Sequence, residues 1–359
     1  MEQRLPLPIG FWAVIFGVSG AVVGSFLNMA IWRLARRKPT EGVFWTLNNP
    51  RRSYCPNCRK PLSVLDNIPL ISFLALGAKC RQCREPIAWR YFWVELLTAG
   101  CFLSLLLHFG ATLEAVAYCL FFSALLAALF IDLEKFIIPD ELNTFALLVG
   151  VAFDIWAVAT HLPGHALLWG WLPRSIFGAI ICAGVFVFIQ LLGFVLFRKE
   201  AMGDGDVKLA RAIGAMLPLS QALVSFLLAI AVGAVLGGLL LAITSARGRG
   251  GPVPEEEQVD DAADEGEPIS LGEIAIRGVF YLAFIDLLVG LGAALRIPAA
   301  VKMMEPLAEE SGEEDDFHPG PTHIPFGPYM VVGAFLAVFF AELLIRWYLA
   351  WTGLTAPPP

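Results

Sequence analysis

Residues 111–160 read ATLEAVAYCL FFSALLAALF IDLEKFIIPD ELNTFALLVG VAFDIWAVAT, two apolar runs separated by a short charged junction. A run of about 20 apolar residues is long enough to cross the hydrocarbon core of a bilayer as a helix. Asp132 closes the first run and Asp140 opens the second. The stretch therefore predicts two membrane helices whose joined ends carry carboxylates.

The whole chain has the composition of a membrane protein. Of its 359 residues, 57% are hydrophobic and 16% are charged, whereas soluble domains average about 45 to 50% and about 25%. This composition excludes a cytosolic enzyme, a secreted disulfide scaffold and a disordered protein. The net charge of −7 is unexpected, because short cytoplasmic loops of inner-membrane proteins carry surplus Lys and Arg.

Two acidic runs account for that charge. Residues 255–267 hold eight acids and residues 305–316 hold seven, and neither run contains Lys or Arg. The remaining 17 acidic and 25 basic residues give +8. Runs of this kind are typical of solvated loops. We expect residues 246–323 to be an acidic insertion around one extra apolar segment, which contains Asp286.

The predicted fold is all-α, a polytopic membrane helix bundle with about eight transmembrane segments and a small cytoplasmic zinc-binding loop domain. A shorter apolar helix is expected over residues 207–217. The eight predicted spans are 9–31, 89–109, 111–131, 141–160, 174–197, 219–243, 272–296 and 325–351.

The loop over residues 33–90 predicts the orientation of the chain. It carries twelve basic and three acidic residues, and loops rich in Lys and Arg stay in the cytoplasm. Because each span takes the chain across the membrane, loops separated by two spans lie on the same side. The 132–141 and 198–211 loops are therefore also predicted to be cytoplasmic. The acids of both loops are therefore expected at the cytoplasmic end of the bundle.

The same loop contains two C-x-x-C pairs, Cys55 with Cys58 and Cys80 with Cys83. A reducing compartment disfavours disulfides, and four thiolates in two such turns suit a closed, tetrahedral structural zinc site. A redox dithiol and four unligated thiols are the alternatives. The other three cysteines lie in apolar spans and are expected to pack as small hydrophobic side chains.

A second acidic cluster, MGDGDVK at residues 202–208, follows the fifth predicted span. Two neighbouring carboxylates share a proton, which is the chemistry of an aspartic protease. Gly203 and Gly205 would let the backbone adopt unusual angles and approach an extended substrate closely. A carboxylate from each cluster is thus a candidate for catalysis.

Each polar residue of these clusters also has a structural interpretation. Asp140, after Pro139, is a candidate helix N-cap, and Asp204 is a candidate turn residue. Asp132 and Asp206 would then be an interfacial acid and a helix cap, and Lys208 a side chain that snorkels to the interface.

Ordered motifs along most of the chain resemble the type 4 prepilin peptidase family, bacterial inner-membrane aspartic proteases. The first are GSFLN at 24–28, RL at 33–34, and the twin C-x-x-C. WRY at 89–91 and VELLT at 94–98 come next. Asp132 with IPD at 138–140 matches the first catalytic motif, GDGDVKL at 203–209 matches GxGDxK, and IPFGP at 324–328 resembles the last span.

The resemblance implies that Asp132 and Asp206 are the catalytic pair and that Asp204 occupies the variable position of GxGD. It implies supporting roles for the other motif residues, which are Pro139, Asp140, Gly203, Gly205 and Lys208. It also implies cleavage of prepilins or pseudopilins after a Gly that ends a short basic leader. A methyl group from S-adenosylmethionine then passes to the new N-terminus, through residues that the sequence does not identify.

The implied partners are prepilin or pseudopilin substrates, the pilus or type II secretion machinery and membrane lipid, with no nucleic acid. The implied location is the bacterial inner membrane, with the zinc loop and both aspartates cytoplasmic. Two other functions remain open, a proton-coupled transporter using Asp132, Asp206 and Asp286 and a non-catalytic assembly factor. The expected divisions are a first helix (1–32), a methyltransferase-associated zinc domain (33–90), a peptidase core (91–245), the insertion (246–323) and a last helix with its tail (324–359).

Overall fold

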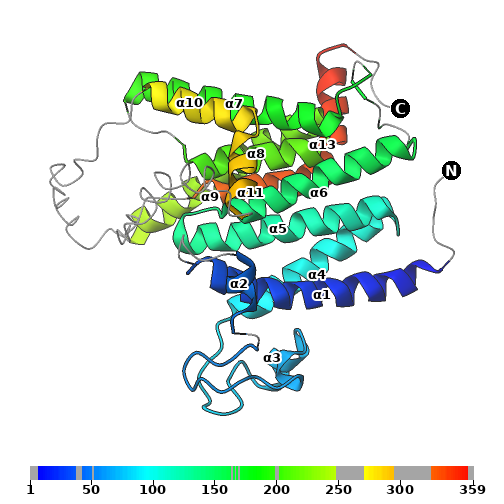
Figure 1. Ribbon diagram of the computed structural model, residues 1–359. Coiled ribbons are helices and arrows are strands. Elements are labelled where there is room, and N and C mark those ends of the chain that lie inside the picture. Colours follow the sequence, from blue (N-terminus) through cyan, green and yellow to red (C-terminus); the bar gives the residue numbers. More distant parts are fainter. Residues whose placement is uncertain are drawn as a thin grey trace.

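The structure, a computed structural model, is a bundle of helices with a small domain beside one end (Figure 1). Its described part holds helices and three isolated β-bridges, which confirms the predicted all-α fold. The described residues are 7–37, 43–50, 52–162, 165, 167–168, 170–198, 202–247, 271–294 and 325–354. Both acidic runs, 255–267 and 305–316, lie outside them.

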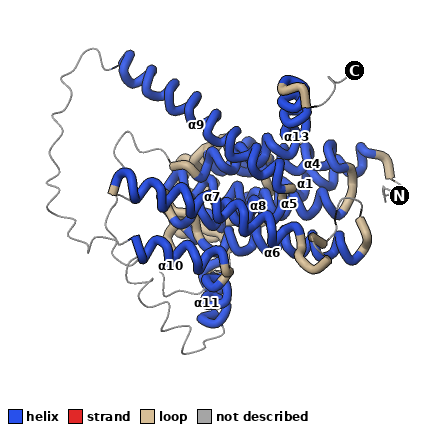
Figure 2. Tube along the Cα trace, turned by 90° about the horizontal axis from the view of Figure 1, so that it is seen from above, coloured by secondary structure: helices blue, strands red, loops and turns tan. Residues whose placement is uncertain are grey.

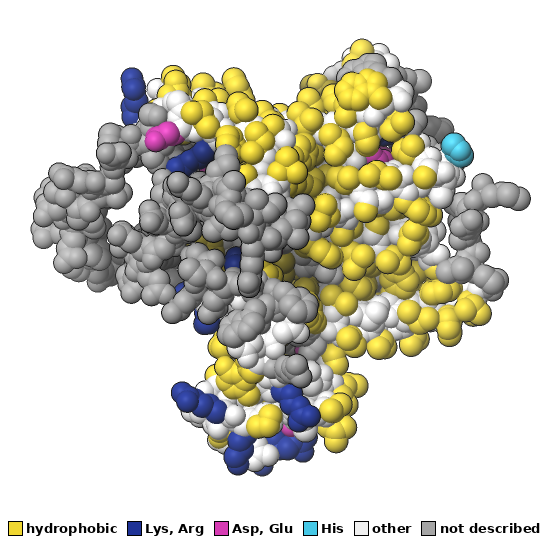
Figure 3. All heavy atoms as spheres, in the orientation of Figure 1, with side chains coloured by type: hydrophobic (Ala, Val, Ile, Leu, Met, Phe, Trp, Pro, Cys, Tyr) yellow, Lys and Arg dark blue, Asp and Glu magenta, His cyan; other side chains and the backbone are white. Residues whose placement is uncertain are grey.

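Seven described helices are long and apolar enough to cross a membrane, and they match seven of the predicted spans. Hydrophobic side chains cover much of the bundle surface in Figure 3, as contact with lipid requires. These helices are α1 (Ile9–Leu34), α4 (Arg90–Phe109), α5 (Leu113–Lys135), α6 (Asp140–Ala159), α7 (Arg174–Phe197), α9 (Leu219–Arg247) and α13 (Gly327–Trp351).

The shorter elements lie at one end of the bundle or inside it. The small domain contains η1 (Leu65–Asn67) and α3 (Ile71–Ala75), and α2 (Val43–Asn48) precedes it. The helix expected over 207–217 is α8 (Asp204–Met216).

The predicted span over residues 272–296 is wrong. This segment forms two short helices, α10 (Leu271–Leu282) and α11 (Ile285–Ala294), and the chain turns between them at Phe284, whose φ is +58°. Neither helix has the length that a bilayer core requires. Hydropathy misjudged the segment because Arg277 and Asp286 form ion pairs with side chains of α8.

Helix α8 is enclosed by the bundle and packs against α6 and α7 (Figures 1 and 2). Glycines permit this close approach. A Cβ atom added to Gly178 of α7 would overlap the carbonyl oxygen of Gly214 of α8. A Cβ atom added to Gly150 of α6 would lie 2.9 Å from the carbonyl carbon of Ala215. Backbone contact on two sides therefore fixes the position of α8.

Helices α1 and α4 approach each other in the same way. A Cβ atom added to Gly20 would lie 2.8 Å from the Cα atom of Ala99. A Cβ atom added to Gly24 would lie 2.7 Å from the Cα atom of Glu95. Asn28 Nδ2 donates a hydrogen bond of 2.9 Å to the carbonyl oxygen of Tyr91. Gly24 and Asn28 of the GSFLN motif thus join α1 to the start of α4.

Replacing Gly178 by Val tests the contact between α7 and α8. The added side chain has no space beside Gly214, so we expect a loss of about 1 to 3 kcal/mol of stability. The thermal midpoint of the detergent-solubilised protein measures this loss. Gly184→Ala on the same helix is the control, because its added Cβ would meet only the Leu282 Cδ2 atom at 3.7 Å. Equal midpoints for Gly178→Val and the unchanged protein would contradict the packing.

Candidate active site and metal centre

Asp132 lies at the end of α5, where the chain reverses direction toward α6. Phe136 takes the left-handed conformation after the last turn, and its N–H donates a hydrogen bond of 2.9 Å to the Asp132 carbonyl oxygen. Pro139 then precedes the first residue of α6. The Asp132 side chain is buried. The reversal places this acid beside the ends of neighbouring helices.

Asp206 lies on the first turn of α8 and is partly buried. Burial, and after it the neighbouring Asp132 carboxylate, raise the pKa of Asp206 to about 7. The structure thus brings together one carboxylate from each acidic cluster. Neighbouring carboxylates of this kind titrate as a unit and hold one proton between them near neutral pH.

The start of α13 closes on Asp132. The backbone N–H of Gly327 is a hydrogen-bond donor to the Asp132 carboxylate. An added Cβ on Gly327 would overlap that carboxylate and lie 2.9 Å from Ile138 Cδ1. Glycine is therefore required where the IPFGP motif meets the acid, since any larger residue would displace the carboxylate.

The two motif glycines of α8 differ in their surroundings. An added Cβ on Gly205 would lie 3.1 Å from Ile138 Cβ, and the Gly205 carbonyl accepts a hydrogen bond of 3.4 Å from Asn143. Gly203 has nothing within 4 Å of an added Cβ, and its φ is −71°. Neither glycine has positive φ, so the expectation of unusual backbone angles is wrong. Gly205 instead packs against the loop that follows Asp132.

Asp140 forms an ion pair with Lys208. The Lys208 Nζ atom lies 2.8 and 2.7 Å from the two carboxylate oxygens of Asp140. The alternative that Asp140 caps α6 is wrong, because Pro139 occupies the cap position and Asp140 is the first helical residue. Lys208 is 13% exposed and does more than snorkel, since its ion pair joins α8 to α6.

Asp204 binds side chains of two other helices. Gln190 of α7 and the Tyr281 hydroxyl of α10 donate hydrogen bonds of 3.1 and 2.8 Å to its two carboxylate oxygens. Arg277 of α10 lies 3.7 Å away. The alternatives that Asp204 is a turn residue and that Asp206 caps the helix are wrong, because α8 begins at Asp204.

Ion pairs join the 33–90 loop to this same end of the bundle. Arg36 and Arg90 both bind Glu134, which follows Asp132 on α5. Arg37 binds Glu141 on the first turn of α6. The prediction that the basic loop and the acidic clusters share one end of the bundle is therefore confirmed.

The four cysteines of the small domain form one cluster, Cys55, Cys58, Cys80 and Cys83, with all sulfur atoms within 4.8 Å of one another. The two turns are alike. In each, an arginine with positive φ donates its backbone N–H to the carbonyl oxygen of the first cysteine, Arg59 to Cys55 and Arg84 to Cys80. The Sγ atoms of Cys55 and Cys83 are 3.8 Å apart, the separation of about 3.8 Å that a tetrahedral site with 2.3 Å metal–sulfur bonds requires. The cluster can hold a metal ion.

The surroundings of the cluster favour thiolates. Backbone hydrogen bonds from Cys83 and Gln82 lower the pKa of Cys80 to about 7. Lys and Arg side chains gather on the surface of this domain (Figure 3). Positive charges nearby offset the charge of four thiolates around a divalent metal.

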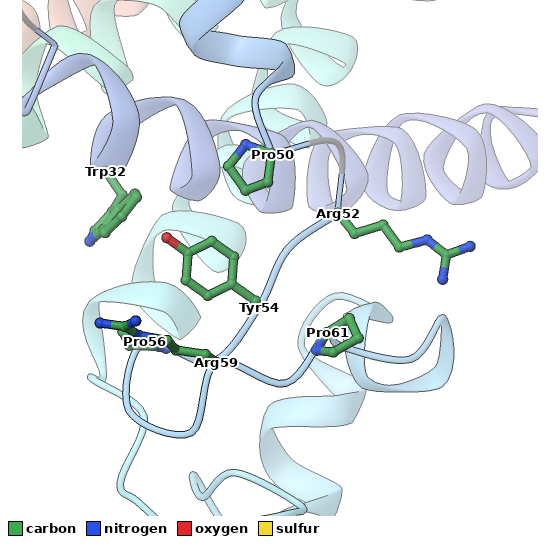
Figure 4. A pocket seen from close by; sticks show the side chains of 7 residues that line it. All are labelled: Trp32, Pro50, Arg52, Tyr54, Pro56, Arg59 and Pro61. Atoms are coloured by element: carbon green, nitrogen blue, oxygen red, sulfur yellow. The ribbon is translucent and has the colours of Figure 1, made fainter.

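A hollow of about 620 Å³ lies between this domain and α1 (Figure 4). The rings of Trp32 and Tyr54 meet edge to face at its side, with centroids 6.4 Å apart. Arg59 adds a guanidinium group to the lining, the Arg52 side chain extends away from the two rings (Figure 4), and prolines at 50, 56 and 61 complete the lining. Such a lining suits a ligand with a flat ring and an anionic group.

Sequence reasoning missed Arg211, Tyr281 and Gln190 as neighbours of the acidic clusters. Arg211 offered a signal, because a cation within the apolar run 207–217 requires a buried partner. The partner, Asp286, lies 75 residues away along the chain and 2.6 Å away in space. Tyr281 and Gln190 gave no pattern that separates them from ordinary residues of apolar helices.

Two family models match parts of this chain. Residues 18–109 match the family model of the bacterial peptidase A24 N-terminal domain, and residues 119–238 match that of the type IV leader peptidase family. No solved structure matches the chain significantly.

Several curated relatives carry the name prepilin leader peptidase/N-methyltransferase. That of Myxococcus xanthus is 33% identical over 340 residues, covering 93% of this chain and 92% of the relative. That of Legionella pneumophila is 29% identical and covers 95% and 96%. That of Pseudomonas aeruginosa is 34% identical and covers 66% and 82%.

The raised pKa of Asp206 predicts how stability changes with pH. The folded chain keeps this proton up to about pH 7, whereas an unfolded Asp loses it near about pH 3.9. The folded state therefore binds more protons in between, and the free energy of unfolding falls as pH rises from about 4 to about 7. Asp206→Asn removes the titrating group and should weaken this fall. Thermal midpoints across that range test it, and an unchanged pH dependence in the variant would refute it.

Proposed function

This chain belongs to the type IV leader peptidase family, and we propose that Asp132 and Asp206 are its catalytic pair. It is an enzyme that removes the leader peptide of prepilins and methylates the new N-terminus. The observation that carries the assignment of the pair is that the buried Asp132 carboxylate lies near enough to the partly buried Asp206 to raise its pKa. Supporting roles are proposed for Pro139, Asp140, Gly203, Gly205 and Lys208.

The proposed chemistry follows from the shared proton. The ionised carboxylate accepts a proton from water, whose oxygen attacks the carbonyl carbon of the scissile peptide bond. The protonated carboxylate donates to the carbonyl oxygen. When the tetrahedral intermediate collapses, the C–N bond breaks and the departing amine receives a proton from the protonated aspartate. A hydroxyl group of the intermediate returns its proton to the ionised aspartate, so the product is a carboxylic acid and the pair again holds one proton. Because the two carboxylates titrate as a unit, either can be the initial donor.

We propose that the four cysteines bind one structural zinc ion. Four thiolates close the coordination shell, so no position remains for water or substrate. The ion would hold the two cysteine turns together, and Arg36, Arg37 and Arg90 would fix the domain to the bundle. Zinc would thus organise the 33–90 domain and leave peptide cleavage to the aspartates.

We propose S-adenosylmethionine as the methyl donor, in keeping with the N-methyltransferase named in the relatives. The hollow between α1 and the cysteine domain is the proposed place for it, on chemical grounds. Trp32 and Tyr54 offer aromatic faces to a nucleobase or a sulfonium cation. Arg59 offers a guanidinium to a carboxylate.

The chain is a multi-pass inner-membrane protein, and we propose that the cysteine domain and both aspartates face the cytoplasm. The basic surplus of the 33–90 loop supports this orientation. The substrates are prepilins, with pseudopilins, the pilus or type II secretion machinery and lipid as proposed partners. A transporter gains no support, because Asp286 is bound to Arg211.

Replacing Asp132 or Asp206 by Asn tests the catalytic pair. Either change removes the shared proton system, so we expect cleavage of a prepilin leader peptide to fall by several orders of magnitude. Incubation with the peptide and S-adenosylmethionine, read by mass spectrometry, reports cleavage and methylation together. Glu342→Gln, on an exposed part of α13, is the matched control. Substantial cleavage by either folded Asn variant would exclude the assignment.

Metal analysis tests the zinc site. We expect about one zinc ion per purified chain, and Cys55→Ser should lower both zinc content and the resistance of the 33–90 domain to proteolysis. Cys101→Ala is the control, because Cys101 is buried in α4 away from the cluster. Stoichiometric disulfides among the four cysteines would contradict the site.

A further inference from the structure

The described part of the insertion, residues 271–294, supplies the counter-charge for a buried arginine. Arg211 of α8 is 2% exposed. Its guanidinium donates hydrogen bonds of 2.8 and 2.6 Å to the two carboxylate oxygens of Asp286 and one of 2.9 Å to the Tyr281 carbonyl. Because a buried charge is strongly unfavourable without a partner, α8 depends on α10 and α11.

The same segment binds the first turns of α8. Tyr281 donates its hydroxyl hydrogen to Asp204 at 2.8 Å, and the Lys208 Nζ atom lies 5.2 Å from the centroid of the Tyr281 ring. Asp204, Lys208 and Arg211 are spaced four and three residues apart, so they form one stripe along the helix. Asp206 lies between them in sequence and projects from another side of α8.

Helix α10 is itself firmly placed. Its Ile274 is 1% exposed, and an added Cβ on Gly278 would clash with a methyl group of Val187 on α7. Figures 1 and 2 show α10 alongside α7, and Figure 2 shows α11 projecting away from the bundle. The Tyr281 contacts to the α8 stripe therefore come from a packed helix, and the Asp286 contact comes from α11, which adjoins it.

We propose that residues 271–294 form a clamp that holds α8 so that Asp206 stays against Asp132. Asp286 and Tyr281 are positioning residues of this clamp, and the proposal rests on the proposed catalytic role of Asp206. Neither matched family range, 18–109 or 119–238, includes the clamp. Helix α13 lies outside both ranges as well, so the family models do not cover every element that contacts the active site.

The test compares cleavage kinetics of clamp variants with those of the unchanged protein. Asp286→Asn keeps the side-chain shape but removes the charge opposite Arg211. A displacement of about 1 Å at a catalytic group costs on the order of 100-fold, so we expect kcat per folded molecule to fall about 10- to 100-fold with KM nearly unchanged. Leu288→Ala, exposed on the same helix, is the control and should cleave normally.

A paired replacement separates positioning from folding. Arg211→Met with Asp286→Leu removes both charges, and such replacements of buried ion pairs are often tolerated. It should recover most of the kcat that Asp286→Asn loses. The rate of amide hydrogen exchange in residues 204–216 should rise in Asp286→Asn. In the double variant it should return to the rate of the unchanged protein. If Asp286→Asn fails to fold, Tyr281→Phe, which deletes only the hydroxyl bound to Asp204, should still lower kcat.

Several results would overturn the clamp. A folded Asp286→Asn variant with the kcat of the unchanged protein would contradict the proposal. If Asp286→Asn does not fold, an unchanged kcat in Tyr281→Phe would contradict it. An equal loss in Leu288→Ala, or a double variant that folds but recovers no kcat, would do so as well. Failure of the catalytic assignment gives a different pattern, in which Asp206→Asn still cleaves.

Discussion

The backbone contact between α7 and α8 is the constraint on which the rest of the structure depends. Gly178 and Gly214 leave no space for a side chain between the two helices, and Gly150 brings α6 equally close on another side. Without a driving force from water, membrane helices associate through such close packing. A 13-residue helix that is too short to span the bilayer is thereby held inside a bundle of longer ones.

Polar contacts then determine the orientation of that enclosed helix. Its exposed end binds α6 through Lys208 and Asp140, and Asp204 reaches α7 and α10. Each of these contacts uses a charged or strongly polar group. Lys208, which is 13% exposed, would be costly to leave unpaired, whereas Asp140 is largely exposed. The active-site end of the bundle is a network of polar contacts around Asp132 and Asp206, in which Asp132 also accepts the Gly327 N–H.

The sequence predicted most of the fold because transmembrane helices are specified by local hydropathy. Seven predicted spans, the buried helix after residue 203 and the cysteine cluster all follow from patterns within about 30 residues of sequence. The prediction of a span over 272–296 is wrong because the apolar content of this segment resembles that of a membrane helix. Its actual conformation, two short helices, depends on ion pairs with Arg211 and Asp204, which are far away along the chain. For the same reason, local sequence patterns do not predict the ion pair of Asp140 with Lys208, which are 68 residues apart. They favour an N-cap role for Asp140 instead.

The glycine contacts also bear on how the protein responds to the thickness of the bilayer. A helix whose apolar length differs from the membrane thickness adjusts by tilting, and tilting requires freedom to slide along its neighbours. Helices α7 and α8 lack that freedom where their backbones touch. The outer helix α9 exposes more of its surface, but its backbone also touches that of α13, where a Cβ atom added to Gly333 would overlap the Ser225 carbonyl oxygen. Changes in lipid composition are therefore expected to tilt these helices together while the distance between Asp132 and Asp206 stays constant.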